Sequence, residues 1–325
     1  MTADNGHDNN RHQYTAHVPV LLDEVLHYLS PVRGGRYLDG TLGLGGHSEA
    51  IMNRCGGDAW LLGLDRDREA LAAASGRLAP FGDRVTTRYA CYSQFAAIMD
   101  EIGWTGLDGA LIDIGVSSMQ IDTPSRGFSF YADGPLDMRM DPSGDIPSAG
   151  VLVNTGSVER LKEIISTYGE DPMAGRIARA IVDARARNPI ETTARLAEVV
   201  ESAYPAKWRA KSRNHPATRT FQALRMAVNG ELEELETFLA AVVDRMNPGG
   251  RIVVITFHSL EDRLVKNAFR DEAKGCLCPR HIPVCVCGKK PRVNVLTRKP
   301  VTAGQAELQA NSRASSAKLR AAERI

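Results

Sequence analysis

Short apolar runs alternate with helical periods along most of the chain from residue 36 onward. Four runs of strand length recur about every 21–26 residues, at 36–40, 60–65, 85–90 and 109–114. Segments with helical patterning, such as 48–54 and 68–78, lie between them. Nearly continuous apolar strands that alternate with helices are typical of a parallel sheet buried on both faces. The pattern therefore predicts an α/β fold with a mostly parallel sheet.

The fifth apolar run, at 251–257, lies too far beyond the fourth to be joined to it by one crossover. The helical period of 217–246 predicts one helix that leads into this strand. The intervening segment, 122–216, is predicted to be an inserted helical domain, with helices at 158–168, from 171 to before 189, and at 193–204. Residues 122–150 show little periodicity and are expected to form a long functional loop. Domain boundaries follow, with a disordered tail at 1–16, a discontinuous domain at 17–121 and 217–325, and the insert at 122–216.

Composition and charge narrow the possible functions. The chain has 325 residues, 43% of them apolar, and its 40 basic residues against 39 acidic ones give a net charge of +1. A run of 18 apolar residues does not occur, and the first 16 residues are polar, so we expect a cytoplasmic protein without a membrane partner. Residues 203–225 hold bases and no acid, namely Lys207, Arg209, Lys211, Arg213, Arg219 and Arg225. Such a cluster fits a nucleic-acid partner, although a solvated basic surface is the plainer interpretation.

A glycine-rich turn follows the first predicted strand and opens a helix. The segment 39–48 reads Asp-Gly-Thr-Leu-Gly-Leu-Gly-Gly-His-Ser, and the second strand ends in Asp65, which can accept hydrogen bonds from a ribose. Both features occur in NAD sites and in S-adenosylmethionine sites. Ser48 stands where the dinucleotide fingerprint needs its third glycine, and Asp39 would repel a pyrophosphate but suit a cationic sulfonium. The sequence therefore favours S-adenosylmethionine over NAD, and a glycine turn without a ligand is a further alternative.

Several long motifs occur in one order and resemble a known family. They include His17–Glu24, Asp39–Ser48, Leu64–Asp67, Asp113–Ser118, Arg126–Phe130, Asp133–Asp141, His215–Gln222, Thr256–Arg263 and Leu319–Arg324. Almost the whole chain thus resembles the bacterial 16S ribosomal RNA (cytosine-N4) methyltransferase family, RsmH/MraW. The resemblance implies a class I S-adenosylmethionine-dependent methyltransferase, Rossmann-like, with an inserted all-helical substrate-recognition domain. It also implies methylation of one cytidine in the decoding region of 16S rRNA within the small (30S) ribosomal subunit. The oligomeric state stays open between a monomer and a homodimer.

The resemblance also assigns residues to the cofactor. Matched by position, the S-adenosylmethionine site would consist of Gly45, Gly46, His47, Asp65, Tyr92, Asp113 and Gln120. Tyr92 stands where relatives often carry Phe, and either ring can pack on an adenine. Thr41 stands at the first glycine position of the general methyltransferase pattern, a departure that this family tolerates.

The chemistry of the target amine points to candidates for catalysis. The N4 lone pair of cytosine is delocalised, so the enzyme must position the base, offer an acceptor near N4 and remove a proton. Asp113 is the first candidate, Ser117 and Ser118 could bind the base edge, and His258 could accept the proton. The alternatives are a strand-end cap for Asp113, plain turn residues for the serines and a structural histidine for His258.

Two further groups of side chains each have two possible roles. Asp137, Arg139 and Asp141 could close over the target or form a local ion-pair network. Trp208 and His215 lie among the bases of residues 207–219 and could stack on unpaired bases.

The cysteines divide into two isolated residues and one crowded group. Cys55 and Cys91 have apolar neighbours in the sequence and are expected to be small core residues. Cys276, Cys278, Cys285 and Cys287 form two Cys-x-Cys pairs, which could hold a structural zinc or form a reduced loop pinned by prolines. Methyl transfer needs no metal, so no catalytic metal site is predicted.

Three other functions compete with the leading one. An amino-directed methyltransferase could act on DNA or another RNA, although the Pro-Pro motif of the DNA enzymes is absent. An RNA-binding assembly factor could keep the fold without catalysis, but the glycine turn and Asp65 are intact. A NAD oxidoreductase is the most distant alternative.

Overall fold

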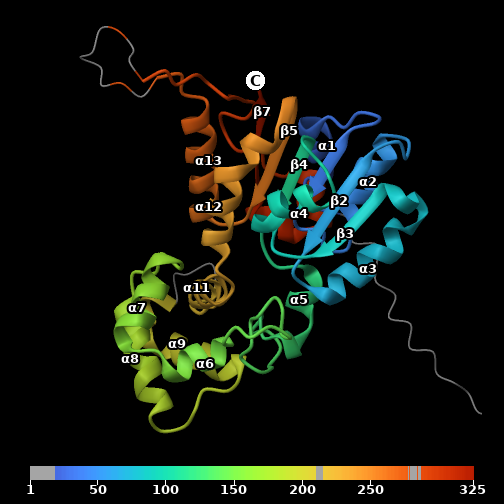
Figure 1. The fold of residues 1–325 in the computed structure, drawn as a ribbon. Helices are drawn as coiled ribbons and strands as arrows, with labels where there is room; N and C mark the ends of the chain where they lie inside the picture. The colour runs from blue at the N-terminus through green and yellow to red at the C-terminus, as the bar shows by residue number, and fades with distance from the viewer. Residues whose placement is uncertain (1–18, 210–214, 277, 279–283, 285–286) are drawn as a thin grey trace, which may run out of the picture.

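The computed structural model describes residues 19–209, 215–276, 278, 284 and 287–325. The predicted tail at 1–16 lies outside the described residues, as do Lys211, Arg213 and Cys285. Figure 1 shows an α/β body beside a smaller helical unit, with the chain passing between them near α5 (Ser118–Asp122) and α11 (Thr218–Asn229). The predicted combination of an α/β body and a helical insert is therefore present.

A seven-stranded sheet forms the centre of the body, in the order β3-β2-β1-β4-β5-β7-β6. The first five strands run parallel, and β7 pairs antiparallel with both β5 and β6. The strands are β1 (Arg36–Asp39), β2 (Trp60–Asp65), β3 (Val85–Tyr89), β4 (Leu107–Asp113), β5 (Met246–Thr256), β6 (Val293–Val295) and β7 (Lys318–Arg324). The order reverses between β1 and β4, and such a switch point places a ligand crevice at the carboxyl ends of the strands.

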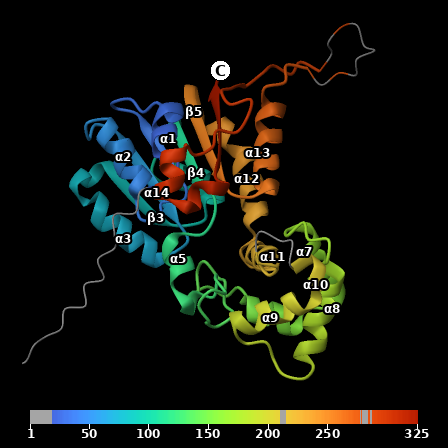
Figure 2. The ribbon, with the colours of Figure 1, turned by 180° about the vertical axis from the view of Figure 1, so that it is seen from behind.

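Helices cover both faces of the sheet, as the near-continuous apolar strands require. One core cluster joins the sheet to α4 (Phe95–Glu101), α12 (Glu231–Val242) and α13 (Ser259–Glu272). The other cluster joins it to α1 (Leu22–Leu29), α2 (Gly46–Arg54) and α3 (Arg68–Leu78). Figures 1 and 2 show these two groups on opposite sides of the strands, with α14 (Gln305–Ala310) beside the second group.

The insert has a hydrophobic core of its own. Serine or threonine side chains at Ser148, Ser157 and Thr192 accept a backbone N–H and begin three of its helices. The helices are α6 (Ala149–Thr155), α7 (Val158–Thr167), α8 (Ala174–Arg185), α9 (Thr193–Ala203) and α10 (Ala206–Arg209). Helix α11 adds Phe221 and Leu224 to the same core, although the predicted boundary at residue 217 assigned it to the body.

The single helix predicted over 217–246 was wrong. The structure has two helices there, because Gly230 adopts a left-handed φ of 61° that ends α11 and begins α12. A short 3-10 turn, η4 (Val243–Arg245), follows α12, and β5 begins directly after it. The apolar period runs through the break, which is why periodicity alone did not reveal it.

The remaining short 3-10 elements are η1 (Ala79–Arg84), η2 (Tyr92–Gln94), η3 (Pro124–Arg126) and η5 (Ser312–Ser316). No helix in the described ranges is long and apolar enough to span a membrane.

Candidate active site

Three neighbouring strands each end in an aspartate at the carboxyl edge of the sheet. Asp39 ends β1, Asp65 ends β2 and Asp113 ends β4. A cavity of about 570 Å³ lies at this edge, and Asp65 and Asp113 are on its wall. Asp39 is 1% exposed and lies beneath the wall. The switch point of the sheet is therefore where the predicted cofactor residues meet.

The glycine-rich turn wraps one side of the cavity. Gly43 and Gly45 have φ values of 51° and 76°, which L side chains rarely adopt. The Gly43 N–H donates to Asp65 Oδ2 at 2.7 Å and ties the turn to β2. Gly43 and Gly46 are on the cavity wall. Gly45 is the residue before α2, and a Cβ there would face Ala74 at 3.3 Å, so the structure gives Gly45 a part in the turn itself.

Asp39 holds the turn from below. Its Oδ2 accepts a hydrogen bond from Ser48 Oγ at 2.6 Å, and its Oδ1 accepts one from the Thr41 N–H at 3.2 Å. Burial raises the pKa of Asp39 to about 6, although the Ser48 hydrogen bond opposes the shift. Asp39, which was expected beside the pocket as a carboxylate that suits a sulfonium, lies beneath the wall and positions the turn.

Asp65 and Tyr92, the residues expected to contact the ribose and the adenine, both lie on the cavity wall. The Asp65 carboxylate also accepts the Asp67 N–H at 2.8 Å, and burial raises its pKa to about 6. Tyr92 lines the cavity, and its ring packs edge-on against Phe238 at a centroid distance of 5.8 Å. Cys91 was predicted to be a core residue, and this was wrong, because it is half-buried on the same wall.

Asp113 is the most perturbed carboxyl of the cavity. Burial, with smaller contributions from the Asp39 and Glu261 carboxylates, raises its pKa to about 8. Within the described part of the chain, its buried Oδ1 has no hydrogen-bond partner. Its Oδ2 lies 3.9 Å from Nδ1 of His47, whose Nε2 lies 2.9 Å from the Val20 carbonyl oxygen. A buried, unsatisfied carboxyl oxygen is costly and indicates a ligand site.

Ser117 and Gln120 form a capping box at the start of α5. Ser117 Oγ accepts the Gln120 N–H at 3.2 Å, and Gln120 Oε1 accepts the Ser117 N–H at 3.0 Å. The Gln120 side-chain amide donates to Asp67 Oδ2 at 2.9 Å. Both residues line the cavity, but both amide atoms of Gln120 are already held by the protein. The Ser117 hydroxyl keeps its proton for donation, since its oxygen acts as the acceptor in the cap.

A buried network that the sequence did not reveal anchors the long loop 122–150. Arg126 is 8% exposed and donates to Asp67 Oδ2 at 2.9 Å and to the Met140 carbonyl at 2.8 Å. From the other side, Asn229 Nδ2 donates to the Met138 carbonyl, and Asn229 Oδ1 accepts the Met140 N–H. Asp137 and Arg139 form a local ion pair at 2.8 Å, which matches the plainer of the two expectations for them.

A second cavity, of about 820 Å³, lies between the insert and the body. Its wall includes Lys207, Trp208, His215, Arg219, His258 and Ser259. Thr218 and Gln222 line both cavities, so the two spaces share a wall on α11. Phe130 lines the first cavity and its ring lies 4.7 Å from the ring of His215. The basic and aromatic residues expected to bind nucleic acid are thus next to the cofactor cavity.

His258 belongs to this second cavity. It caps α13, where its Nδ1 accepts the Leu260 N–H at 3.4 Å. Burial lowers its pKa, although Glu170 acts in the opposite sense. A neutral imidazole follows, and its cap hydrogen bond supports the structural role that was the alternative for this residue.

A buried charge cluster at the wall of the first cavity was missed. Arg225, which we counted among the bases suited to a nucleic acid, belongs to this cluster, because its charge is held by a buried glutamate. Arg225 donates two hydrogen bonds of 2.8 Å to Glu231 and lies 3.8 Å from Glu261. Burial raises the pKa of Glu261 to about 7, while Arg225 holds it down. Arg225 lies between apolar residues of the predicted helix. A charged residue at such a position is the signal in the sequence from which a buried charge cluster could have been predicted.

The wall of the first cavity fits S-adenosylmethionine. The glycine turn lets the backbone approach a ligand, Asp65 offers carboxylate oxygens for a ribose, and the unsatisfied Asp113 carboxyl suits a cationic group. Fold and site together define a class I S-adenosylmethionine-dependent methyltransferase.

The chain belongs to the MraW methylase family, whose family model matches residues 14–325. It is 99% identical over 325 residues, the full length of both chains, to the ribosomal RNA small subunit methyltransferase H of Oleidesulfovibrio alaskensis. It is 68% identical over 311 residues to the ribosomal RNA small subunit methyltransferase H of Nitratidesulfovibrio vulgaris strain Miyazaki F. The aligned region covers 96% of this chain and 86% of that one. The resemblance inferred from the motifs is confirmed.

Proposed function

We propose that the protein methylates the exocyclic N4 of one cytidine in 16S rRNA, with the small ribosomal subunit as its substrate. One observation carries the proposal: a cavity that fits S-adenosylmethionine shares the Thr218 and Gln222 wall with a larger cavity lined by basic and aromatic side chains. The relatives are named as methyltransferases of small-subunit ribosomal RNA, which agrees with this arrangement.

The second cavity suits an unstacked nucleotide. Lys207 and Arg219 supply positive charge for phosphates, and Trp208, which is 49% exposed, offers a ring for stacking. A cytosine in structured RNA must leave its stack to react, at a cost of a few kcal/mol. Base stacking on Trp208 and phosphate contacts to the two cations offset this cost.

Asp113 is the residue proposed to act on the target amine. Bound S-adenosylmethionine supplies an electrophilic methyl group, so the protein must orient N4 and take up its proton. The unsatisfied Asp113 carboxyl can accept a hydrogen bond from N4, which favours the localised lone pair. Ser117 has a hydroxyl proton to donate to an acceptor on the base edge. His258, on the other cavity, is proposed as a route for the proton to solvent.

The test is methyl transfer from labelled S-adenosylmethionine to small subunits that lack the modification, with free 16S rRNA and DNA in parallel. Nucleoside mass spectrometry of the product is expected to show N4-methylcytidine from the subunits. Asp113→Asn is expected to abolish transfer while S-adenosylhomocysteine still binds. Arg160→Ala, in an exposed ion pair on α7, serves as the control and should leave transfer unchanged.

Two results would contradict the proposal. Transfer to DNA in preference to either RNA would favour another amino-directed methyltransferase. Cofactor binding without transfer to any of the three substrates would favour the assembly-factor alternative.

A further inference from the structure

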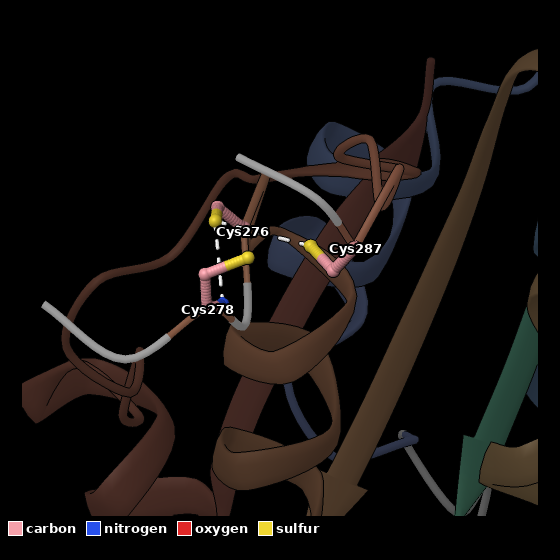
Figure 3. A group of neighbouring side chains, drawn as sticks. All are labelled: Cys276, Cys278 and Cys287. Atoms are coloured by element: carbon pink, nitrogen blue, oxygen red, sulfur yellow. Dashed lines mark hydrogen bonds between the residues drawn. The ribbon is translucent and has the colours of Figure 1, made fainter. Parts of the chain in front are cut away.

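Three cysteine side chains converge on the segment between α13 and β6, at the end of the body away from the insert (Figures 1 and 3). The sulfur atoms of Cys276, Cys278 and Cys287 all lie within 4.8 Å of one another. Cys276 and Cys287 are exposed, and Cys278 is half-buried. Cysteine is among the residues most often buried, so three thiols gathered at a surface need a reason other than packing.

The spacing of the sulfurs matches a tetrahedral metal. Two thiolates bound to zinc at about 2.3 Å each lie about 3.8 Å apart across a tetrahedral angle. The Sγ atoms of Cys276 and Cys287 are 3.8 Å apart. A disulfide would require about 2.05 Å between them. The distances between the three sulfur atoms are therefore short enough for one metal ion to contact all of them.

The surroundings suit a metal centre built from sulfur. The Cys278 N–H donates to Cys276 Sγ at 3.3 Å, and such N–H donors commonly orient sulfur atoms that bind a metal. The described residues near the cluster, 270–276 and 287–292, contain five basic and two acidic side chains. A positive environment offsets the charge of a centre in which three thiolates surround a divalent cation.

Among the residues of this segment that the structure describes, 276, 278, 284 and 287–292, none belongs to a hydrophobic core cluster. Its base is closed by Arg292, whose N–H donates to the Glu272 carbonyl at 2.9 Å, and by Lys289, whose Nζ donates to the Asp271 carbonyl at 2.7 Å. Beyond that base, Val284 is 71% exposed. A small unit without buried apolar area commonly depends on a metal or another cross-link.

We propose that Cys276, Cys278 and Cys287 bind a structural zinc ion that fixes the segment leading into the edge strand β6. Each thiol releases its proton to solvent on binding, so three protons leave and the three-thiolate centre carries one negative charge. Tetrahedral zinc takes one further donor. Soft thiolates select zinc over magnesium or calcium, and the cavity residues derived above include none of the three cysteines.

Metal analysis of the untagged full chain tests the proposal directly. Mass spectrometry of the metal content after dialysis against a chelator is expected to give about one zinc per chain. The double variant Cys276→Ser/Cys287→Ser should retain less than about a tenth of that amount. Cys91→Ser, which removes a thiol next to β3, the edge strand opposite β6, should retain all of it.

Cobalt substitution gives a second measurement that does not depend on how the variants fold. Cobalt(II) bound to the wild-type chain should show thiolate-to-metal charge-transfer bands and the intense visible bands of tetrahedral coordination. Calorimetry should also show that the double variant binds S-adenosylhomocysteine within about twofold of wild type, since the cluster lies away from the cofactor cavity. Loss of zinc with the fold retained supports the proposal.

Four outcomes would overturn it. They are less than about 0.5 zinc per chain in wild type, iron in place of zinc, a Cys276–Cys287 disulfide in the unreduced protein, or equal zinc in wild type and double variant.

Discussion

The raised pKa of Asp113 predicts a specific pH dependence of cofactor binding. In the ligand-free protein, burial and the neighbouring carboxyls raise this pKa to about 8, so at neutral pH the carboxyl is mostly protonated. A sulfonium cation beside it favours the carboxylate. Binding of S-adenosylmethionine below about pH 8 must therefore expel a proton, and the affinity should rise with pH up to about 8 and then level off.

The size of the effect follows from the pKa. Each pH unit below the pKa costs a factor of about ten, or about 1.4 kcal/mol, if only the ionised form binds. A cation about 5 Å from a carboxylate gains about 3 kcal/mol at an effective dielectric constant of about 20, which is enough to reach that limit. We therefore expect the affinity to fall about 10–30-fold from about pH 8.5 to about pH 6.5.

The assay compares two ligands that differ at the sulfur. S-adenosylhomocysteine lacks the sulfonium charge but keeps the amino group, so the ratio of the two affinities cancels the titration of that amino group. Isothermal titration calorimetry in two buffers of different ionisation enthalpy should show release of nearly one proton with S-adenosylmethionine at about pH 7, and almost none with S-adenosylhomocysteine.

Two variants separate Asp113 from other carboxyls. Asp113→Asn should make the affinity ratio independent of pH in this range. Asp108→Asn, at the amino end of the same strand β4, should keep the dependence. A wild-type affinity ratio that varies less than about threefold over this pH range, or an Asp113→Asn ratio that keeps the wild-type slope, would contradict the prediction.

Three further predictions concern stability and RNA binding. The folded pKa of Asp113 lies above its ordinary value, so the ligand-free fold loses stability as pH rises from about 4 to about 8. Asp113→Asn should therefore raise the thermal midpoint by about 5 °C or more at about pH 8.5 and by about 2 °C or less at about pH 5, and equal shifts would contradict this. Arg126→Ala should lower the free energy of unfolding, measured in urea, by about 3 kcal/mol, because it breaks a buried ion pair. The exposed Arg160→Ala should lower it by under about 0.5 kcal/mol, and equal losses would refute the anchoring role of Arg126. Lys207→Ala with Arg219→Ala should lower the salt slope of RNA binding by about 1.4, measured by fluorescence anisotropy, and an unchanged slope would exclude phosphate contacts there.

The parallel part of the fold was predictable because β1, β2 and β4 are largely apolar and β3 is rich in β-branched residues. Strands β1 to β4 were expected within about two residues of their bounds, and so was the insert after β4. β6 and β7 were not predicted, because the three residues of β6 and the charged sequence of β7 carry little strand pattern. Their place depends on pairing with β5, which is a long-range interaction.

The site also contains residues that the sequence pattern predicts and residues that it does not. Asp65 and Asp113 were predictable because they end apolar strands, and the carboxyl ends of parallel strands meet at one edge. Arg126 and Asn229 were not, because each is buried only through partners distant in sequence. Cys91 was misplaced because the cavity wall is also apolar, so apolar neighbours did not distinguish wall from core.

Helix α11 explains why an insertion at this point of the fold serves the proposed reaction. Its apolar face, with Phe221 and Leu224, lies in the core of the insert, while Thr218 and Gln222 line both cavities. At its end, Asn229 binds the long loop through two hydrogen bonds, one to the Met138 carbonyl and one from the Met140 N–H. A displacement of the insert would therefore move the shared wall and the loop together. We therefore propose that an RNA bound to the insert would act on the cofactor cavity through α11. If so, substitutions in the core around α11 should change the rate of transfer more than the affinity for the cofactor.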